Sequence, residues 1–296
     1  MKTILFATDC TSNAASILKY AYRFSSIMKA DLHILHVYNF PPIGLSTIQP
    51  IESLKKRIHD EQIEVLKKYY TKHLKNEFCH KTIITHVVEN SSVSESILRL
   101  SNILNPDLIM VGTKSEQNLR GLFAGNIANE LLDNIDIPLL IVPKDVSIEK
   151  FSTIIYATDF EQEDFVAIQK LVEVAKSLEA FIEIIHVYKL DQTVAKNNME
   201  MFSRSLSKKI SYPEITFRTI ASTKIKSGLL SVLNGEKASM LAMLERNQSW
   251  SFTSLFHKDL VKDMEATINI PILAFNKRTT DIELETVSQV KRELAY

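Results

Sequence analysis

Residues Asp107–Pro143 have the sequence DLIMVGTKSEQNLRGLFAGNIANELLDNIDIPLLIVP, and this stretch decides the fold class. Its apolar runs Leu108–Val111 and Leu139–Val142 show no period-2 alternation, so they predict parallel strands buried on both faces. Between them, apolar residues recur at helical spacing, namely Ile127, Leu131, Leu132 and Ile135. A strand, a loop, a helix and a second strand in this order are typical of a doubly wound α/β sheet.

The loop between this strand and this helix is rich in glycine. Gly112, Gly121 and Gly125 are 3 of the 6 glycines in the chain, and Lys114 and Arg120 lie among them. Glycine lets a ligand approach the main chain, and a helix N-terminus presents free N–H groups to an anion. The stretch therefore predicts a phosphate site, with two alternatives left open. Short glycine-bounded turns also simply reverse chains, and loop cations are often only solvated.

The bulk composition limits the classes of function. A chain of 296 residues, 45% hydrophobic and 24% charged, is long enough for two globular domains. Lysine plus arginine and aspartate plus glutamate number 35 each, so no net field favours nucleic acid or an anionic membrane. Cys10 and Cys79 lack CxxC spacing, and Asp9 interrupts the apolar run Ile4–Ala7 near the N-terminus. We expect a soluble cytoplasmic protein.

The first half alternates predicted strands with predicted helices. Strands are predicted at Ile4–Ala7, Leu32–Tyr38 and Ile83–Val88, before the two named above. The first helix follows Thr11 or Ser12 as its cap, the second runs from about Ile51 to Lys75, and a capping box of Ser92 and Glu95 starts the third. This order implies a parallel sheet with helices on both faces.

The chain then repeats itself. Ile154–Asp159 resembles Ile4–Asp9 at an offset of 150 residues (159 − 9), and Ile185–Tyr188 resembles Leu35–Tyr38 at the same offset (188 − 38). A third match relates Ile270–Leu273 to the start of the fifth strand, at an offset of 133 (270 − 137). Three matches in one order predict a tandem duplication. The expected domains are residues 1–146 and 147–278, followed by a helical tail over 279–296.

Each half resembles a universal stress protein domain, over about residues 1–276. The resemblance rests on the Ala-Thr-Asp ends of the first strands at Asp9 and Asp159 and on the His-Val-Tyr of the second strands. It rests also on a pattern G-x2-G-x9-G-[S/T], which here consists of Gly112, Ser115, Gly125 and Asn126. The resemblance implies two five-stranded parallel sheets of order 3-2-1-4-5. It also implies ATP, with or without Mg²⁺, between strands one and four.

The resemblance also implies which residues bind the nucleotide. Asp9 would face the ribose, Ala7 and Val37 would line the adenine, and the glycine pattern would lie at the phosphates. The full set is Ala7, Thr8, Asp9, Val37, Val111, Gly112, Ser115, Gly125, Asn126 and Ile127. Ser115 departs from the family's glycine and would cost roughly 1 kcal/mol or more if its φ is positive. Asn126 replaces Ser or Thr but is itself a good helix N-cap.

The second half departs further from the pattern. Met243 and Arg246 stand in the places of Gly112 and Ser115, and no glycine follows Gly235. Bulky residues occupy the phosphate loop, namely Trp250, Phe252 and Phe256 to Lys258. We expect these aromatic residues to fill the pocket or an interface, with base stacking as the alternative. No nucleotide site of the family type is expected in this half.

Several side chains have a plain structural interpretation beside the functional one. Asp9 could be a ribose ligand, a metal ligand or a phospho-acceptor, but an aspartate that caps the next helix would also explain Asp159. His36 and His186 recur on buried strands, which favours a structural role. Motifs for a positioned nucleophile or a metal are absent from the sequence, so no catalytic residue and no metal site is expected.

The sequence therefore predicts a stress-response protein that binds ATP in its first half and acts as a regulator, at most a very slow ATPase. The alternatives are a nucleotide-free interaction scaffold and, by fold analogy alone, an adenylyl-transferring enzyme. Both fifth strands, Leu139–Val142 and Ile272–Phe275, are strongly apolar. We expect them to meet in an intramolecular pseudo-dimer with an approximate two-fold axis, since exposed apolar edges invite aggregation. An unknown protein partner and a further homodimer are also expected.

Overall fold

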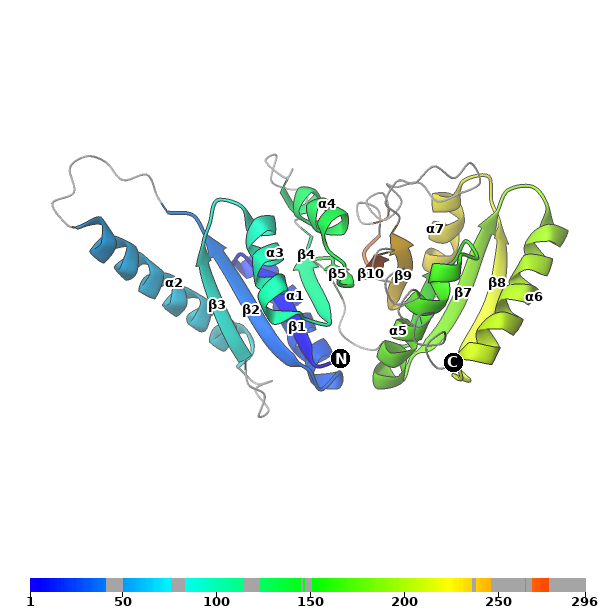
Figure 1. The fold of residues 1–296 in the computed structure, drawn as a ribbon, viewed down its shortest axis with the longest axis horizontal. Coiled ribbons are helices and arrows are strands. Elements are labelled where there is room, and N and C mark those ends of the chain that lie inside the picture. The colour runs from blue at the N-terminus through cyan, green and yellow to red at the C-terminus, as the bar shows by residue number, and fades with distance from the viewer. Residues whose placement is uncertain are drawn as a thin grey trace, which may run out of the picture. The chain divides into compact units, whose positions relative to one another are not determined.

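The structure is a computed structural model that describes residues 1–40, 50–75, 83–113, 123–144, 146, 151–235, 238–245, 264 and 268–276. Strands and helices alternate along the chain, which confirms the predicted α/β class (Figure 1). The chain divides into two compact units. Unit 1 comprises Met1–Leu131 and Val142–Val146, and unit 2 comprises Leu132–Ile141 and Ser147–Tyr296.

The sheet of unit 1 is parallel and follows the predicted order. Its strands lie in the order β3 (Ile83–Glu89), β2 (Asp31–Tyr38), β1 (Thr3–Thr8) and β4 (Leu108–Gly112). The central strand β1 pairs Ile4 with Leu32 on one side and with Leu108 on the other. These three side chains are at most 1% exposed, because helices cover both faces of the sheet.

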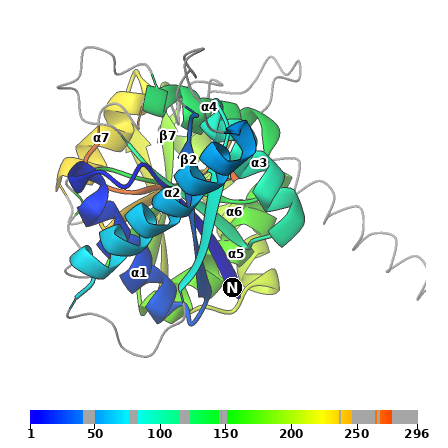
Figure 2. The ribbon, with the colours of Figure 1, turned by 90° about the vertical axis from the view of Figure 1, so that its left-hand side faces the viewer.

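The helices of unit 1 bury the apolar faces that the sequence predicts. They are the 3₁₀ turn η1 (Ser12–Ala14), α1 (Ala15–Ile27), α2 (Ile51–His73), α3 (Val93–Leu104) and α4 (Phe123–Asn134), whose last three residues belong to unit 2. Helix α1 buries residues at helical spacing, including Ile17, Leu18 and Ala21. Helix α2 is charged and buries only Leu66 and Tyr69. Figure 2 shows α1 and α3 on opposite sides of the strands.

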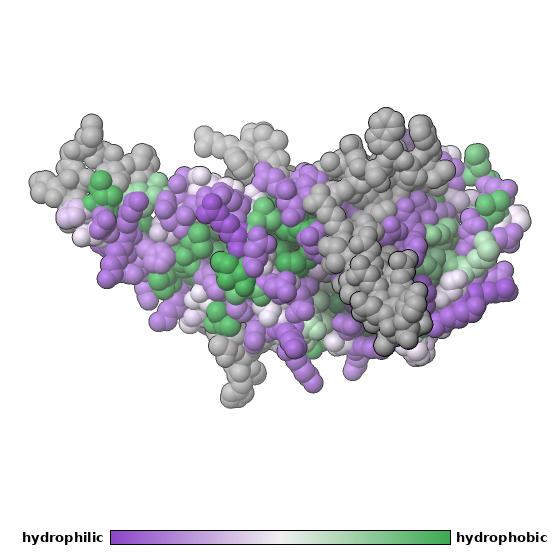
Figure 3. Space-filling view, viewed as in Figure 1, coloured by the Kyte–Doolittle hydropathy of each residue, from purple (hydrophilic) through white to green (hydrophobic). Residues whose placement is uncertain are grey.

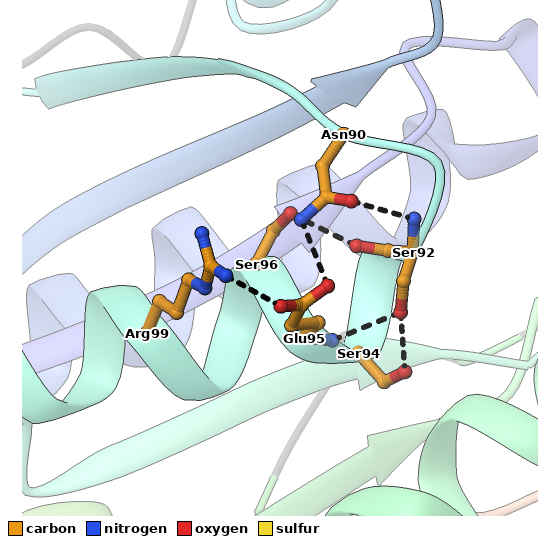
Figure 4. A network of polar contacts seen from close by, with 6 residues as sticks. All are labelled: Asn90, Ser92, Ser94, Glu95, Ser96 and Arg99. Carbon is orange, nitrogen blue, oxygen red and sulfur yellow. Dashed lines mark hydrogen bonds and ion pairs between the residues drawn. The ribbon is translucent and has the colours of Figure 1, made fainter.

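The cap of α3 differs in part from the predicted capping box (Figure 4). Ser92 Oγ accepts a hydrogen bond from the Glu95 backbone N–H at 3.2 Å, as predicted. The reciprocal bond is made by another residue, because the Ser92 N–H donates to Asn90 Oδ1 at 3.0 Å. The Glu95 carboxylate instead pairs with Arg99 at 2.7 Å and accepts from Asn90 Nδ2 at 3.3 Å. Two side chains, those of Ser92 and Asn90, thus accept backbone N–H groups at this helix start.

Unit 2 repeats the architecture. Its parallel strands lie in the order β8 (Ile215–Ala221), β7 (Phe181–Tyr188), β6 (Thr153–Ala157), β9 (Met240–Glu245) and β10 (Ile272–Asn276). Numbered within this half of the chain, this is the order 3-2-1-4-5. The helices are α5 (Gln162–Leu178), α6 (Gln192–Lys209) and α7 (Ile225–Gly235). Ile154 pairs with Ile182 and Met240, as Ile4 pairs with Leu32 and Leu108, so the register repeats as well.

Strand β5 (Leu139–Val142) pairs in unit 2 with β10. The pairing is antiparallel and places Leu273 opposite Leu140, and these side chains are 1% and 0% exposed. Residues 139–141 of β5 therefore pair with β10 within unit 2. At the end of β10, Asn276 Nδ2 donates to the backbone carbonyls of Leu132 at 3.1 Å and Ile135 at 2.6 Å, which satisfies carbonyl groups at the end of α4.

The surface of the described residues is mixed in character. Hydrophilic side chains cover much of the face in Figure 3, and hydrophobic ones are scattered between them. The most exposed large hydrophobic residues are Leu190, at 96%, and Ile103, at 79%. Among the helices that the structure describes, none combines the length and apolar character needed to cross a membrane.

Candidate functional site

Asp9 lies directly after β1, at the carboxyl edge of the sheet in unit 1. Its Oδ1 accepts hydrogen bonds from the backbone N–H of Thr11 at 3.0 Å and from the Thr11 hydroxyl at 2.8 Å. Cys10 between them has a positive φ of 57°, which produces the tight turn. The turn fixes the Asp9 carboxylate, while the residue itself remains exposed and accessible to a ligand.

The role of Thr11 differs from the one predicted. Thr11 precedes η1, but its side chain makes no capping hydrogen bond to that turn, and α1 begins only at Ala15. The hydroxyl group donates to Asp9 instead. Sequence reasoning therefore missed Thr11 as a residue that positions the site. The signal was present in the Asp-x-Thr spacing, which favours this type of turn.

Most of the predicted site residues gather at the same edge. Ala7 and Thr8 end β1, Val37 lies one position beyond the partner of Thr8 on β2, and Val111 and Gly112 end β4. Because parallel strands all end at one edge of a sheet, these five positions lie together beside Asp9. The structure thus places these five positions at one edge of the sheet.

The glycine loop itself is described only in part. Ser115, Lys114, Arg120 and Gly121 lie outside the described residues. Helix α4 begins at Phe123, so Gly125 and Asn126 lie in its first turn and Ile127 directly follows. The expectation that Asn126 caps this helix is therefore wrong, because the helix starts earlier. The first turn still carries backbone N–H groups with no partner inside the helix, which is what an anion requires.

The glycine at position 112 has a packing explanation. A Cβ atom there would lie 2.4 Å from Cδ1 of Ile17, far inside van der Waals contact. Ile17 on α1 is 4% exposed, so it has little room to move away. A side chain at position 112 would therefore require Ile17 to move, which gives Gly112 a packing explanation beside any role at a ligand.

The register of unit 2 corrects one predicted equivalence. Ile4 pairs with Leu108 and its repeat Ile154 pairs with Met240, so the fourth strands correspond at an offset of 132 (240 − 108). The residue in the place of Gly112 is therefore Leu244, and the predicted Met243 takes the place of Val111. Sequence matching was wrong by one position because no glycine marks the end of β9. Arg246, Trp250, Phe252 and Phe256 to Lys258 lie outside the described residues.

Asp159, the repeat of Asp9, has different surroundings. Its Oδ1 lies 3.9 Å from Nδ1 of His186, and its side chain is only 13% exposed. Phe160 follows with a φ of 63°, and its ring packs on His186 and on Phe202, with centroid separations of 4.3 and 5.5 Å. The carboxylate of unit 2 is thus directed toward protein groups, whereas that of unit 1 is exposed.

The two repeated histidines have a structural role, as expected. Nδ1 of His36 lies 3.2 Å from the carbonyl of Thr8, and Nδ1 of His186 lies 2.9 Å from the carbonyl of Thr158. A carbonyl only accepts, so each Nδ1 carries the proton and donates it. Nε2 of His36 also lies 3.1 Å from Oε1 of Gln62 on α2. In both units the imidazole holds the end of the first strand.

Unit 2 contains a buried carboxyl group that the sequence interpretation overlooked. Asp164 is 2% exposed and accepts hydrogen bonds from the hydroxyl groups of Tyr156 and Thr158, both at 2.7 Å, and from the Glu161 N–H at 3.0 Å. Burial raises the pKa of Asp164 to about 6, although these three donors oppose the rise. Glu161 and Asp164 form a capping box at the start of α5, which the Glu-x-x-Asp spacing could have indicated.

The chemistry available beside Asp9 is limited. Burial, and next the charge of Asp9, raise the pKa of the Cys10 thiol to about 12, so it is not a thiolate at neutral pH. Within the ranges that the structure describes, no three or more His, Cys, Asp or Glu side chains are grouped to hold a metal ion. The arrangement suits binding through hydrogen bonds more than nucleophilic attack.

The chain is similar to known proteins of one family. The sequence profile of the universal stress protein family matches residues 1–143. A universal stress protein of Methanocaldococcus jannaschii is 26% identical over 144 residues, which cover 48% of this chain and 82% of that protein.

Two solved structures match nearly the whole chain. A universal stress protein from Archaeoglobus fulgidus covers 93% of this chain and 98% of its own, with a TM-score of 0.69 and 17% identity. A putative universal stress protein from Pseudomonas aeruginosa covers 97% and 98%, with a TM-score of 0.61 and 12% identity. At these identities the structural matches establish the fold of both halves.

Proposed function

The chain belongs to the universal stress protein family through residues 1–143, and on this basis we propose that unit 1 binds an adenine nucleotide, ATP in the first place. The ligand would lie at the carboxyl ends of β1 and β4, beside Asp9. The protein would act as a cytoplasmic regulator in a stress response, with a protein partner that reads its nucleotide state.

The observation that carries this proposal is the contrast between Asp9 and Asp159. Asp9 is exposed, and its turn with Thr11 fixes the carboxylate without occupying it fully. Such a group accepts hydrogen bonds from the two hydroxyls of a ribose at little entropic cost. Asp159 is 13% exposed and directed toward His186, which supports one nucleotide per chain.

The phosphates would lie at the start of α4. Gly125 and Asn126 lie in the first turn of this helix, where backbone N–H groups and the positive end of the helix dipole favour an anion. The nucleotide would thus be held at both ends, by a carboxylate at the sugar and by a helix N-terminus at the phosphates. Ser115 lies outside the described residues, and we expect it beside the phosphates, where it lowers affinity relative to glycine.

A regulatory role fits this site better than a catalytic one. The raised pKa of Cys10 keeps its thiol protonated, and Nδ1 of His36 is occupied by the Thr8 carbonyl. A nucleophile and a free base at neighbouring positions would be needed for efficient phosphoryl or adenylyl transfer. At most a very slow ATPase is expected.

An interaction scaffold without nucleotide is the second candidate. It is favoured by one observation, namely that the contact with Ile17 explains Gly112 without any ligand. If the glycine pattern were retained only for packing, unit 1 could have lost its nucleotide.

Paired substitutions in the full chain test the proposal. We expect Asp9→Ala to weaken ATP binding at least tenfold in calorimetric titration, because ribose contacts are lost. The matched change Asp159→Ala should leave the affinity within twofold. Similar losses in both variants, or none in either, would contradict the assignment of the site, and a wild-type protein that binds no adenine nucleotide would favour the scaffold.

A further inference from the structure

His33 on β2 and His86 on β3 lie side by side on one face of the sheet of unit 1. Nδ1 of His33 is 2.9 Å from Nε2 of His86. The ring planes differ by 11°, and the ring centroids are 5.1 Å apart. The centroid separation exceeds the distance between the two nitrogens by only 2.2 Å (5.1 − 2.9). The rings therefore meet edge to edge in nearly one plane, and their nitrogens point at each other.

This pair lies at the edge of the sheet, away from the Asp9 site. In the register, Ile84 is opposite His33 and Leu35 is opposite His86, so the two imidazoles are diagonal neighbours on one face. Strand β3 is the terminal strand of the sheet order, and His86 is half-buried while His33 is 9% exposed. An ion can thus approach from the side of the edge strand. His33 is opposite Leu5, three residues before the end of β1, so the pair is separated from Asp9, which follows that end.

Both imidazoles favour the neutral form. Burial lowers the pKa of His86, and the neighbouring His33 lowers it further. Burial also lowers the pKa of His33, against a smaller opposite effect from Asp31.

We propose that His33 and His86 form a two-imidazole site for a divalent transition-metal ion such as Zn²⁺. As it stands, one ring donates its N–H to the other. A tautomer change in that ring moves the proton to its other nitrogen, and the two lone pairs then face each other. Imidazole nitrogen is a preferred ligand of zinc, copper and nickel, so the chemistry of the pair matches this class of ion.

The required rearrangement changes both the separation and the direction of the two nitrogens. With Zn–N bonds of about 2.05 Å and a tetrahedral angle, two ligating nitrogens lie about 3.3 Å apart. The present 2.9 Å would widen by about 0.4 Å, and each ring would turn by about 35° so that its lone pair points at the ion instead of at the other nitrogen.

Water and Asp31 would complete the coordination. Asp31 is exposed and lies two residues before His33, so both belong to one face of β2, and its charge already acts on the His33 ring. Because the structure shows no preassembled group of three such ligands among its described residues, the site would bind more weakly than a four-ligand structural zinc site.

Zinc titration of the chelator-treated full chain, without nucleotide, tests this proposal. We expect one calorimetric binding event, which His33→Gln and His86→Gln each weaken at least tenfold. His59→Gln is the matched control, because His59 lies in the same unit, on α2, with its Nδ1 3.3 Å from the Tyr38 hydroxyl. That variant should bind zinc like the wild type.

Nitrogen NMR of the wild-type imidazoles gives a readout that does not depend on how the variants fold. Zinc should shift Nδ1 of His33 and Nε2 of His86 together. The proposal is overturned if the wild type binds no zinc, if zinc leaves these two resonances unchanged, or if His59→Gln loses as much affinity as the other two. The result is independent of ATP binding at Asp9.

Discussion

A side chain at position 112 would occupy the space of the δ-methyl group of Ile17, because a Cβ there would lie 2.4 Å from Cδ1 of Ile17. The repeat has the opposite combination of residues at the equivalent positions. The equivalent strand position is Leu244, and the helix position 150 residues after Ile17 is Ala167, which is fully buried. Unit 1 has a large residue on the helix and a small one on the strand. Unit 2 has a small residue on the helix and a large one on the strand.

This contact predicts a coupling between positions 17 and 112. Gly112→Ala should destabilise the protein by about 1–3 kcal/mol, because the new methyl group overpacks a buried contact. In an Ile17→Val background, which lacks Cδ1, the same substitution should cost at least about 0.5 kcal/mol less. Chemical unfolding of the four proteins measures the coupling. Additive costs would show that Ile17 does not limit position 112.

The buried Asp164 predicts a pH dependence. Its folded-state pKa of about 6 is above the ordinary value of 3.8, so the folded protein takes up this proton at higher pH than the unfolded chain. The resulting stabilisation is complete below about pH 4 and is lost as the pH rises through about 6, and it amounts to roughly 3 kcal/mol.

Carbon NMR of the Asp164 carboxyl group should therefore show a titration midpoint near 6. The stability of the wild type relative to Asp164→Asn, which cannot titrate, should rise as the pH falls from 7 to 4. A midpoint near 4, or parallel stability profiles of the two proteins, would contradict this account of the buried group.

The ladder between β5 and β10 predicts strong sensitivity at Leu273. Leu273→Lys should cost several kcal/mol or cause aggregation, because it places an unpaired charge opposite Leu140 where the side chain is 1% exposed. Leu190→Lys is the matched control, since Leu190 is 96% exposed and the same change should stay within about 0.5 kcal/mol. Thermal unfolding with light scattering distinguishes the two, and equal behaviour would argue against a buried ladder.

The sequence could predict the strands and their order because the signals are local and repeated. Uninterrupted apolar runs identify buried strands. Because Ile154–Asp159 matches Ile4–Asp9, the order of elements predicted for the first half also predicts that of the second half. The pairing of β5 with β10 could be anticipated because both strands are apolar and would otherwise be exposed at the edge of a sheet. Ser92 as the α3 cap followed from its spacing to Glu95.

Features that depend on packing or on distant residues could not be predicted in this way. The start of α4 at Phe123 rather than after Asn126, and the role of Leu244 in place of Met243, depend on tertiary context and strand register. Nor does any sequence pattern connect His33 with His86, which are 53 residues apart and meet only because β2 and β3 are neighbours.

The central claim is that unit 1 alone binds nucleotide. Calorimetric titration of the nucleotide-free full chain with ATP tests it most directly, because the stoichiometry counts the sites without any substitution. The contrast between the exposed Asp9 and the enclosed Asp159 predicts one ATP per chain. A stoichiometry of two, or no heat of binding for ATP, ADP or AMP, would contradict it.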